Sequence, residues 1–296
     1  MTSGESVPPL AERTPVGTSK GPLLAIGAGI TFGTLGIFGT LFYDHGGAPF
    51  PLLVLRFCGG SVVLVAIALA LRLPRPDRSE LRWGVLAGMG QLGGTGCLFA
   101  GYEHASPGLV TLLFYVYPLL VTVGDRAIFG VVLGRARMLV LLAGLAGIAL
   151  TVGSPGSASA GGVLWGLAAG VLTAAYILVS RHVLARTAEP IRFIAIAFSC
   201  AAIAALVVAL FAGVDWPPAE ALPAAAGVIV LGSVVPVLLF YSAISLAGAG
   251  TASRLATVEP VTAVVLSYLV LGDSLTATQI VGGVIVVASV VMLARS

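Results

Sequence analysis

Basic residues in this chain occur almost only in every second gap between long apolar segments. Of its fifteen Lys and Arg residues, only Arg56 and Arg254 lie inside an apolar segment. The intervening gaps contain acidic residues such as Asp44, Glu103 and Asp273, but no Lys or Arg. This is the positive-inside pattern of a protein that crosses a membrane many times, because basic loops stay on the cytoplasmic side. The thirteen patterned residues are Arg13, Lys20, Arg72, Arg75, Arg78, Arg82, Arg126, Arg135, Arg137, Arg181, Arg186, Arg192 and Arg295.

Ten membrane-spanning helices account for the apolar segments. The chain is 58% hydrophobic and 9% charged, with a mean hydropathy of +1.08, whereas a soluble domain has roughly 25% charged residues. About 20 helical residues cross a hydrocarbon core, and strands of a barrel would alternate polar and apolar residues, which these segments do not. Both termini then lie on the basic, cytoplasmic side. The predicted spans are 22–42, 49–71, 83–102, 107–125, 138–153, 162–180, 193–212, 222–245, 250–271 and 277–294.

The same composition excludes several partners. The net charge of +3 comes from basic loops that orient the chain in the membrane, so no nucleic acid is expected. The three cysteines lie within apolar segments and the three histidines in separate loops, so neither a disulfide nor a metal site is predicted. No nucleotide-binding motif is present, and no cofactor is expected.

The two halves of the chain resemble each other. The segment ASPGLVTLLFYVYPLL aligns without gaps on AGAGTASRLATVEPVT, which matches Gly108 to Gly250 and Pro118 to Pro260. Five helices per half is an odd number, so the copies must lie in opposite orientations across the membrane, as in many secondary transporters. We therefore expect a disordered tail at 1–21, five-helix repeats at 22–153 and 162–294, and an external linker at 154–161.

The second copy resembles the EamA branch of the drug/metabolite transporter superfamily. The resemblance is carried by LATVEPVTAVVLSYLVLGDSLTATQIVGGVIVVASVVML at 255–293, in which an apolar-Pro helix runs into a Leu-Gly-acid turn and a last helix with a Gln and glycines. In the first copy, Arg135 replaces the acid of that turn. The resemblance implies an all-α inner-membrane carrier that exports small metabolites, such as amino acids, their derivatives or amphipathic compounds.

Polar stripes on the fourth and ninth spans predict a binding site. Thr111, Tyr115 and Pro118 share one helical face, and the matching positions are Ser253, Thr257 and Pro260. Each proline leaves the carbonyl four residues earlier without its donor, available to a ligand or water. The alternative is that the hydroxyls bond back to their own helix and the prolines only bend it.

Three charges inside the predicted spans are further candidates. An ionised Glu259 is costly in lipid unless it faces the bundle interior, so it either exchanges protons or forms a structural bond. Arg56 lies slightly outward of Glu259 in depth and can reach it, or can bind a substrate carboxylate or phosphate. Arg254 either binds an anion or extends toward the cytoplasmic headgroups.

Other polar and aromatic residues complete the predicted site. Tyr115, Tyr117, Tyr176 and Tyr241 lie deep enough to line a cavity, together with the matched pair of Gln91 and Ser233. Glycines spaced four apart, as in Gly84-x3-Gly88, Gly90-x3-Gly94 and Gly29-x3-Gly33, are typical of close helix packing.

These features predict a secondary transporter that works by alternating access around a central cavity, with protons as a candidate coupling ion. A facilitative uniporter or an exchanger without ion coupling is the alternative. A membrane-embedded enzyme would need a convergent set of reactive groups, and the spans contain no His and only one central acid. A receptor would be expected to have longer loops or a soluble domain.

Overall fold

The computed structural model describes residues 20–129, 134–152, 159–184, 189–247, 252, 255–256 and 258–295. Nearly all of the predicted tail and linker lies outside these ranges. The helices are α1 (Lys20–Gly33), α2 (Leu35–Asp44), α3 (Pro49–Ala70), α4 (Arg78–Tyr102), α5 (Pro107–Phe114), α6 (Tyr117–Phe129), α7 (Arg135–Val152), α8 (Ala160–Leu184), α9 (Pro190–Ala212), α10 (Leu222–Ile229), α11 (Val235–Ala247), α13 (Val258–Leu271) and α14 (Ala277–Arg295).

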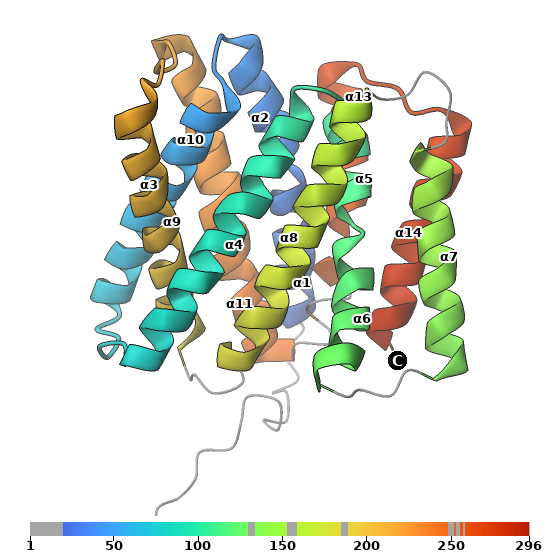
Figure 1. Ribbon diagram of the computed structural model, residues 1–296, viewed down its shortest axis with the longest axis horizontal. Coiled ribbons are helices and arrows are strands. Elements are labelled where there is room, and N and C mark those ends of the chain that lie inside the picture. Colours follow the sequence, from blue (N-terminus) through green and yellow to red (C-terminus); the bar gives the residue numbers. More distant parts are fainter. Residues whose placement is uncertain are drawn as a thin grey trace, which may run out of the picture.

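The helices stand side by side and together form ten membrane crossings (Figure 1). Within the described residues, six stretches are long and apolar enough to cross a membrane, and three shorter apolar helices accompany them. The remaining crossing is α4, the third in chain order. It is less apolar because its first turns carry Arg78, Glu80 and Arg82. The prediction of an all-α, multi-span protein is confirmed.

The third crossing begins earlier than its apolar pattern indicated. Its helix starts at Arg78, because the Asp77 carboxylate accepts a hydrogen bond of 2.7 Å from the backbone N–H of Glu80. This is an N-cap of the Asp-x-x-Glu kind, which satisfies a backbone donor of the first turn. The helix therefore extends beyond the apolar segment on the side where the basic loops lie, here called the basic face.

Contacts between the helices follow the two-repeat pattern. Three pairs of contacting helices are equivalent members of the two halves, namely α3 with α9, α5 with α13, and α7 with α14. Other contacts occur once in each half. The third crossing of the first half, α4, packs on α8, and its equivalent α11 packs on α1. Likewise α8 packs on α5 and α6, and its equivalent α1 packs on α13. Helices α1 and α8, the first of each half, run in opposite directions (Figure 1). This arrangement is an inverted repeat of five crossings.

Glycines bring α4 close to two helices of the other half, as their spacing predicted. A Cβ atom on Gly88 would collide with the Ala197 carbonyl oxygen of α9 and lie 3.1 Å from Cys200 Cβ. A Cβ atom on Gly94 would lie 2.7 Å from Thr173 Oγ1 of α8. Because lipid supplies little force to bring helices together, this close approach is what makes their packing favourable.

Three crossings are interrupted near their middle. Thr34 separates α1 from α2, and a turn at Tyr115 and Val116 separates α5 from α6. Between α10 and α11 lies a π-helical turn, Val230–Val234, where the Ser233 hydroxyl donates to the Val228 carbonyl at 2.8 Å. Of these three, the sequence predicted only the interruption near Pro118, since Thr34 and Ser233 each follow a glycine, a residue that occurs 39 times in the chain.

The Leu-Gly-acid turn of the second half has a clear structural role. Gly272 ends α13 with a φ of 73°, a left-handed conformation that glycine adopts without strain. The Asp273 carboxylate then accepts a hydrogen bond of 2.6 Å from the Ser267 hydroxyl one turn back. This bond ties the turn to the end of α13 opposite the basic face.

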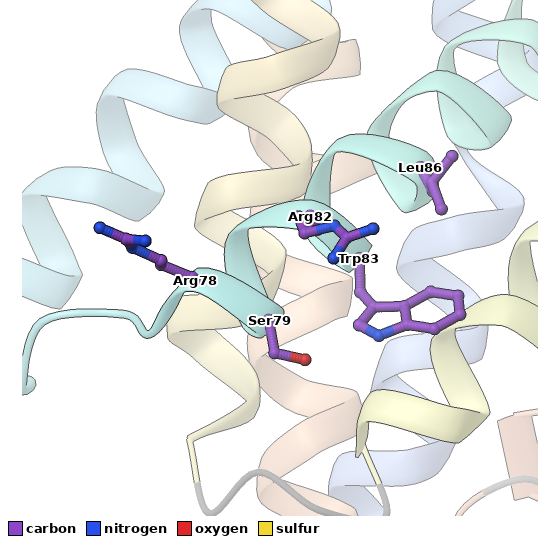
Figure 2. Close-up of a pocket in the computed structure, with 5 residues that line it drawn as sticks. All are labelled: Arg78, Ser79, Arg82, Trp83 and Leu86. Atoms are coloured by element: carbon purple, nitrogen blue, oxygen red, sulfur yellow. The ribbon is translucent and has the colours of Figure 1, made fainter.

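The basic face is held by an ion pair and bordered by an aromatic ring. Arg192 at the start of α9 contacts the Glu80 carboxylate of α4, with Nη2 at 2.8 Å and Nε at 3.0 Å. Nearby, a surface hollow of about 300 Å³ is lined by Arg78, Ser79, Arg82, Trp83 and Leu86 (Figure 2). The Arg side chains and the Trp83 ring lie together there, which is the arrangement expected where helices enter the headgroup region.

The close contact at Gly88 gives a test of the packing. We expect Gly88→Ala to lower the free energy of unfolding in detergent by about 1–3 kcal/mol, because the new methyl group would push against the α9 backbone. Gly134→Ala is the matched control, since a Cβ atom there would meet nothing within 4 Å. Equal stability of the two variants would contradict this packing.

Candidate functional site

A hydrogen bond joins the two halves inside the membrane. The Tyr115 hydroxyl donates to Glu259 Oε2 at 2.9 Å. Tyr115 follows the last residue of α5, and Glu259 lies in the first turn of α13, the equivalent helix of the other half. Tyr115 is 2% exposed, whereas Glu259 is half-buried. The described residues therefore bond the Glu259 carboxyl group through Oε2 and leave part of the residue exposed.

The break between α5 and α6 sets the position of Tyr115. The backbone N–H of Tyr115 donates to the carbonyls of Thr111 and Leu112, and that of Val116 donates to the Leu113 carbonyl at 3.1 Å. The bonds to Leu112 and Leu113 reach back only three residues, so the last turn of α5 is tighter than an α-helical turn. Pro118 has no N–H to give to the Phe114 carbonyl, and the helix resumes only at Tyr117. Tyr115 thus lies in the interruption rather than on a regular helical face.

The two carbonyls that the prolines release are covered by glycines. A Cβ atom on Gly170 of α8 would lie 2.8 Å from the Phe114 oxygen, and one on Gly29 of α1 would lie 2.6 Å from the Ala256 oxygen. Glycines of the neighbouring helices thus lie close to both carbonyls, and the availability of these carbonyls to a ligand stays a prediction. The same contact occurs in both halves, which is further support for the repeat.

Helix α1 also packs directly on Glu259. A Cβ atom on Gly33 would lie 2.9 Å from the Glu259 carbonyl oxygen and 2.7 Å from Thr262 Cβ. Gly33 is the last residue of α1, next to the interruption at Thr34. Two interrupted crossings therefore meet at Glu259.

Aromatic rings border the Tyr115–Glu259 bond. The Tyr117 ring lies 4.9 Å from the Phe114 ring and 5.5 Å from the Tyr115 ring, measured between centroids. Phe114 and Tyr117 are half-buried, as Glu259 is, so they belong to the accessible side of the group. In the register of the two halves, Tyr117 is the position that corresponds to Glu259.

Arg56 of α3 is buried beside this bond and lacks the partners that a guanidinium usually has. Its side chain is 5% exposed, and its Nε and Nη1 atoms make no hydrogen bond with the described part of the chain. The guanidinium carbon lies 5.8 Å from the Phe57 ring centroid and 5.7 Å from that of Phe99. Its charge interacts with that of Glu259, yet within the described residues no ion pair of 4.0 Å or less joins them. The two side chains are thus near enough to interact, while a direct meeting of Arg56 and Glu259 stays a prediction.

Tyr102 is a member of this group that the sequence did not reveal. Its side chain is 6% exposed and lies close enough to Thr111 and Arg56 to interact with both. Tyr102 is the last residue of α4, and a tyrosine at a helix end is expected to anchor the helix at the membrane surface. Its place in this group was therefore not predicted. The available signal was its helical spacing from Gln91 and Thr95, which places all three on one face of α4.

The remaining predicted residues form a second group nearer the basic face. Tyr176 of α8 and Tyr241 of α11 interact electrostatically, and a Cβ atom on Gly90 would lie 3.1 Å from Tyr176 Cβ. The neighbouring Gln91 has a buried Oε1 atom that no described residue contacts by a hydrogen bond. Ser233, in contrast, bonds back to its own helix and offers no free hydroxyl hydrogen.

Three predicted residues, Ser253, Arg254 and Thr257, lie outside the described residues. Two other hydroxyls of these crossings bond back to their own helix, since Thr122 donates to the Pro118 carbonyl at 2.8 Å and Thr262 donates to the Val258 carbonyl at 3.0 Å. The described site therefore centres on Arg56, Tyr102, Thr111, Tyr115, Tyr117 and Glu259.

Comparison with solved structures gives the fold. One of them, titled "Crystal structure of protein", has a TM-score of 0.66 and 22% sequence identity, and the match covers 94% of this chain and 98% of that chain. No curated protein matches the sequence.

The family comparison covers almost the whole chain, in two parts. The model of the EamA-like transporter family matches residues 19–153 and, a second time, residues 160–295. Each match contains one of the five-crossing halves, and the Tyr115–Glu259 bond joins one match to the other. The chain therefore belongs to the EamA-like transporter family.

Proposed function

We propose that this protein is a secondary transporter of the cell's inner membrane that exports small metabolites by alternating access, with Glu259 carrying the coupling proton. Amino acids, their derivatives and amphipathic compounds are the proposed solutes. Both termini lie in the cytoplasm in this proposal, which the distribution of basic residues supports.

The observation that carries the proposal is the Tyr115–Glu259 hydrogen bond. Glu259 lies twelve residues from Leu271, the end of α13, which at 1.5 Å per residue is about 18 Å along the helix. An acidic group at such depth is costly when ionised, so it is usually paired or functional. Among the described residues, the Tyr115 hydroxyl donates to it, and the residue is half-buried, which supports an approach by a proton or a solute.

The position of the bond suits alternating access. It connects equivalent crossings of the two inverted halves, and these halves must move relative to each other when access changes sides. A hydrogen bond to a carboxylate is worth about 1.5–3 kcal/mol. That is enough to favour one conformation, yet small enough for protonation or solute binding to reverse the preference.

The coupling role of Glu259 can be tested with purified protein in liposomes. We expect Glu259→Gln to abolish solute movement driven by a pH gradient while solute exchange continues, because glutamine keeps the shape of the side chain but cannot release a proton. Glu220→Gln is the control, since Glu220 is exposed in the loop before α10. If gradient-driven movement survives in Glu259→Gln, the acid is structural and the protein is a uniporter or an exchanger.

The connection between the halves has its own test. Tyr115→Phe removes the hydroxyl and keeps the ring, so we expect a loss of about 1.5–3 kcal/mol in the free energy of unfolding. Combined with Glu259→Ala, its effect should be clearly less than additive, because both changes remove the same bond. Tyr268→Phe serves as the control, since Tyr268 is 64% exposed. Fully additive effects would show that the two residues do not interact in the folded protein.

A further inference from the structure

Two arginines that lie mostly inside this protein have opposite surroundings. Arg192 is 15% exposed and binds the Glu80 carboxylate through Nε and Nη2, while its Nη1 donates to the Pro74 carbonyl at 2.9 Å. Arg56 is 5% exposed, and its Nε and Nη1 donate to no group in the described part of the chain. Within the described residues, all three nitrogens of the Arg192 guanidinium therefore have acceptors, whereas Nε and Nη1 of Arg56 have none.

The surroundings of Arg56 compensate its charge only partly. Two aromatic ring faces lie within 6 Å, which favours a cation. Its Nε and Nη1 still have no acceptor among the described residues, and buried donors without acceptors are unfavourable. Glu259, the acid whose charge reaches it, is held by Tyr115 instead.

The Nε and Nη1 donors of Arg56, unpaired within the described residues, match one class of ligand group, an anion. Nε and Nη1 lie on different edges of one planar guanidinium, and an arginine presents such donors to anions such as carboxylates. The rings beside it, Phe57 and Phe99, are fully buried and apolar. A solute that satisfies this site has an acid group and an apolar part next to it.

We propose that Arg56 is the anion-binding residue of the transport site and that the solutes are small organic acids with an apolar side group, bound through the carboxylate. This inference deepens the proposed transport function and rests on it. Arg56 lies seven residues into α3, about 10 Å from the end opposite the basic face, and it is closed from solvent in this conformation. The acid group reaches it when the crossings around Tyr102 and Tyr115 separate.

The test compares acids with their uncharged amides on the purified full-length protein. N-acetylphenylalanine and N-acetylleucine are measured against the corresponding primary amides, by thermal shift for binding and by counterflow in liposomes for transport. We expect the acids to stabilise the wild-type protein more than the amides do, and to bind at least about tenfold more weakly to Arg56→Gln. The response to the amides should not change in that variant.

Two further variants separate this role from a structural one. Arg56→Lys keeps the charge but not the planar set of donors, so it should retain a reduced preference for acids. Arg192→Gln breaks a buried ion pair far from the site, so it should lower the melting temperature and keep the full acid preference. If Arg56→Gln does not fold, the wild-type comparison and Arg56→Lys still decide the question.

The outcomes distinguish this inference from the proposed function. Equal binding of acids and amides by the wild-type protein, or an acid preference that persists in Arg56→Gln, would overturn the role of Arg56 even if amides or other solutes exchange. Acid binding that depends on Arg56, without counterflow of any solute, would support the anion site and contradict the transport function.

Discussion

Hydrocarbon offers no hydrogen bonds, so each polar group that enters it must find a partner within the protein or keep a route to water. The arrangement at the centre of this molecule follows from that constraint. Glu259 lies in the first turn of α13, where the Tyr115 hydroxyl of the other half can reach it. Arg56 is accommodated between two aromatic rings. The helix interruptions at Thr34 and at Tyr115–Val116 place backbone and side chains where a regular helix would not.

Close helix packing and the central polar group depend on each other. Gly33 lets α1 approach the backbone of Glu259, and glycines of α1 and α8 cover the carbonyls that the two prolines release. The membrane supplies little force to bring helices together, so these contacts have to come from small residues. The same glycines thereby fix the depth and direction of the side chains that we assign to transport. A larger residue at one of them would displace the site as well as weaken the fold.

The crossings and their repeat could be predicted from the sequence, because hydropathy and the positions of basic residues report directly on the membrane. An approach of Arg56 to Glu259 was expected from their depth, although no ion pair joins the two in the described residues. The Tyr115–Glu259 bond was not predicted. The π-helical turn at Ser233 and the break at Thr34 could not be predicted, since packing between the halves decides them. Tyr102 was missed because a tyrosine at a span end looks the same whether it faces lipid or the interior.

The two halves share a backbone plan but differ at one informative pair of positions. Tyr117 in the first half corresponds to Glu259 in the second. Glu259 bonds to Tyr115, which lies two residues before Tyr117. In an inverted repeat made of identical halves, a two-fold rotation would relate the inward-open and outward-open forms, and they would have equal energy. Here an acid occupies one position and a phenol the other. In the alternating access that we propose, the two forms therefore differ in energy, and the charge of Glu259 contributes to that difference.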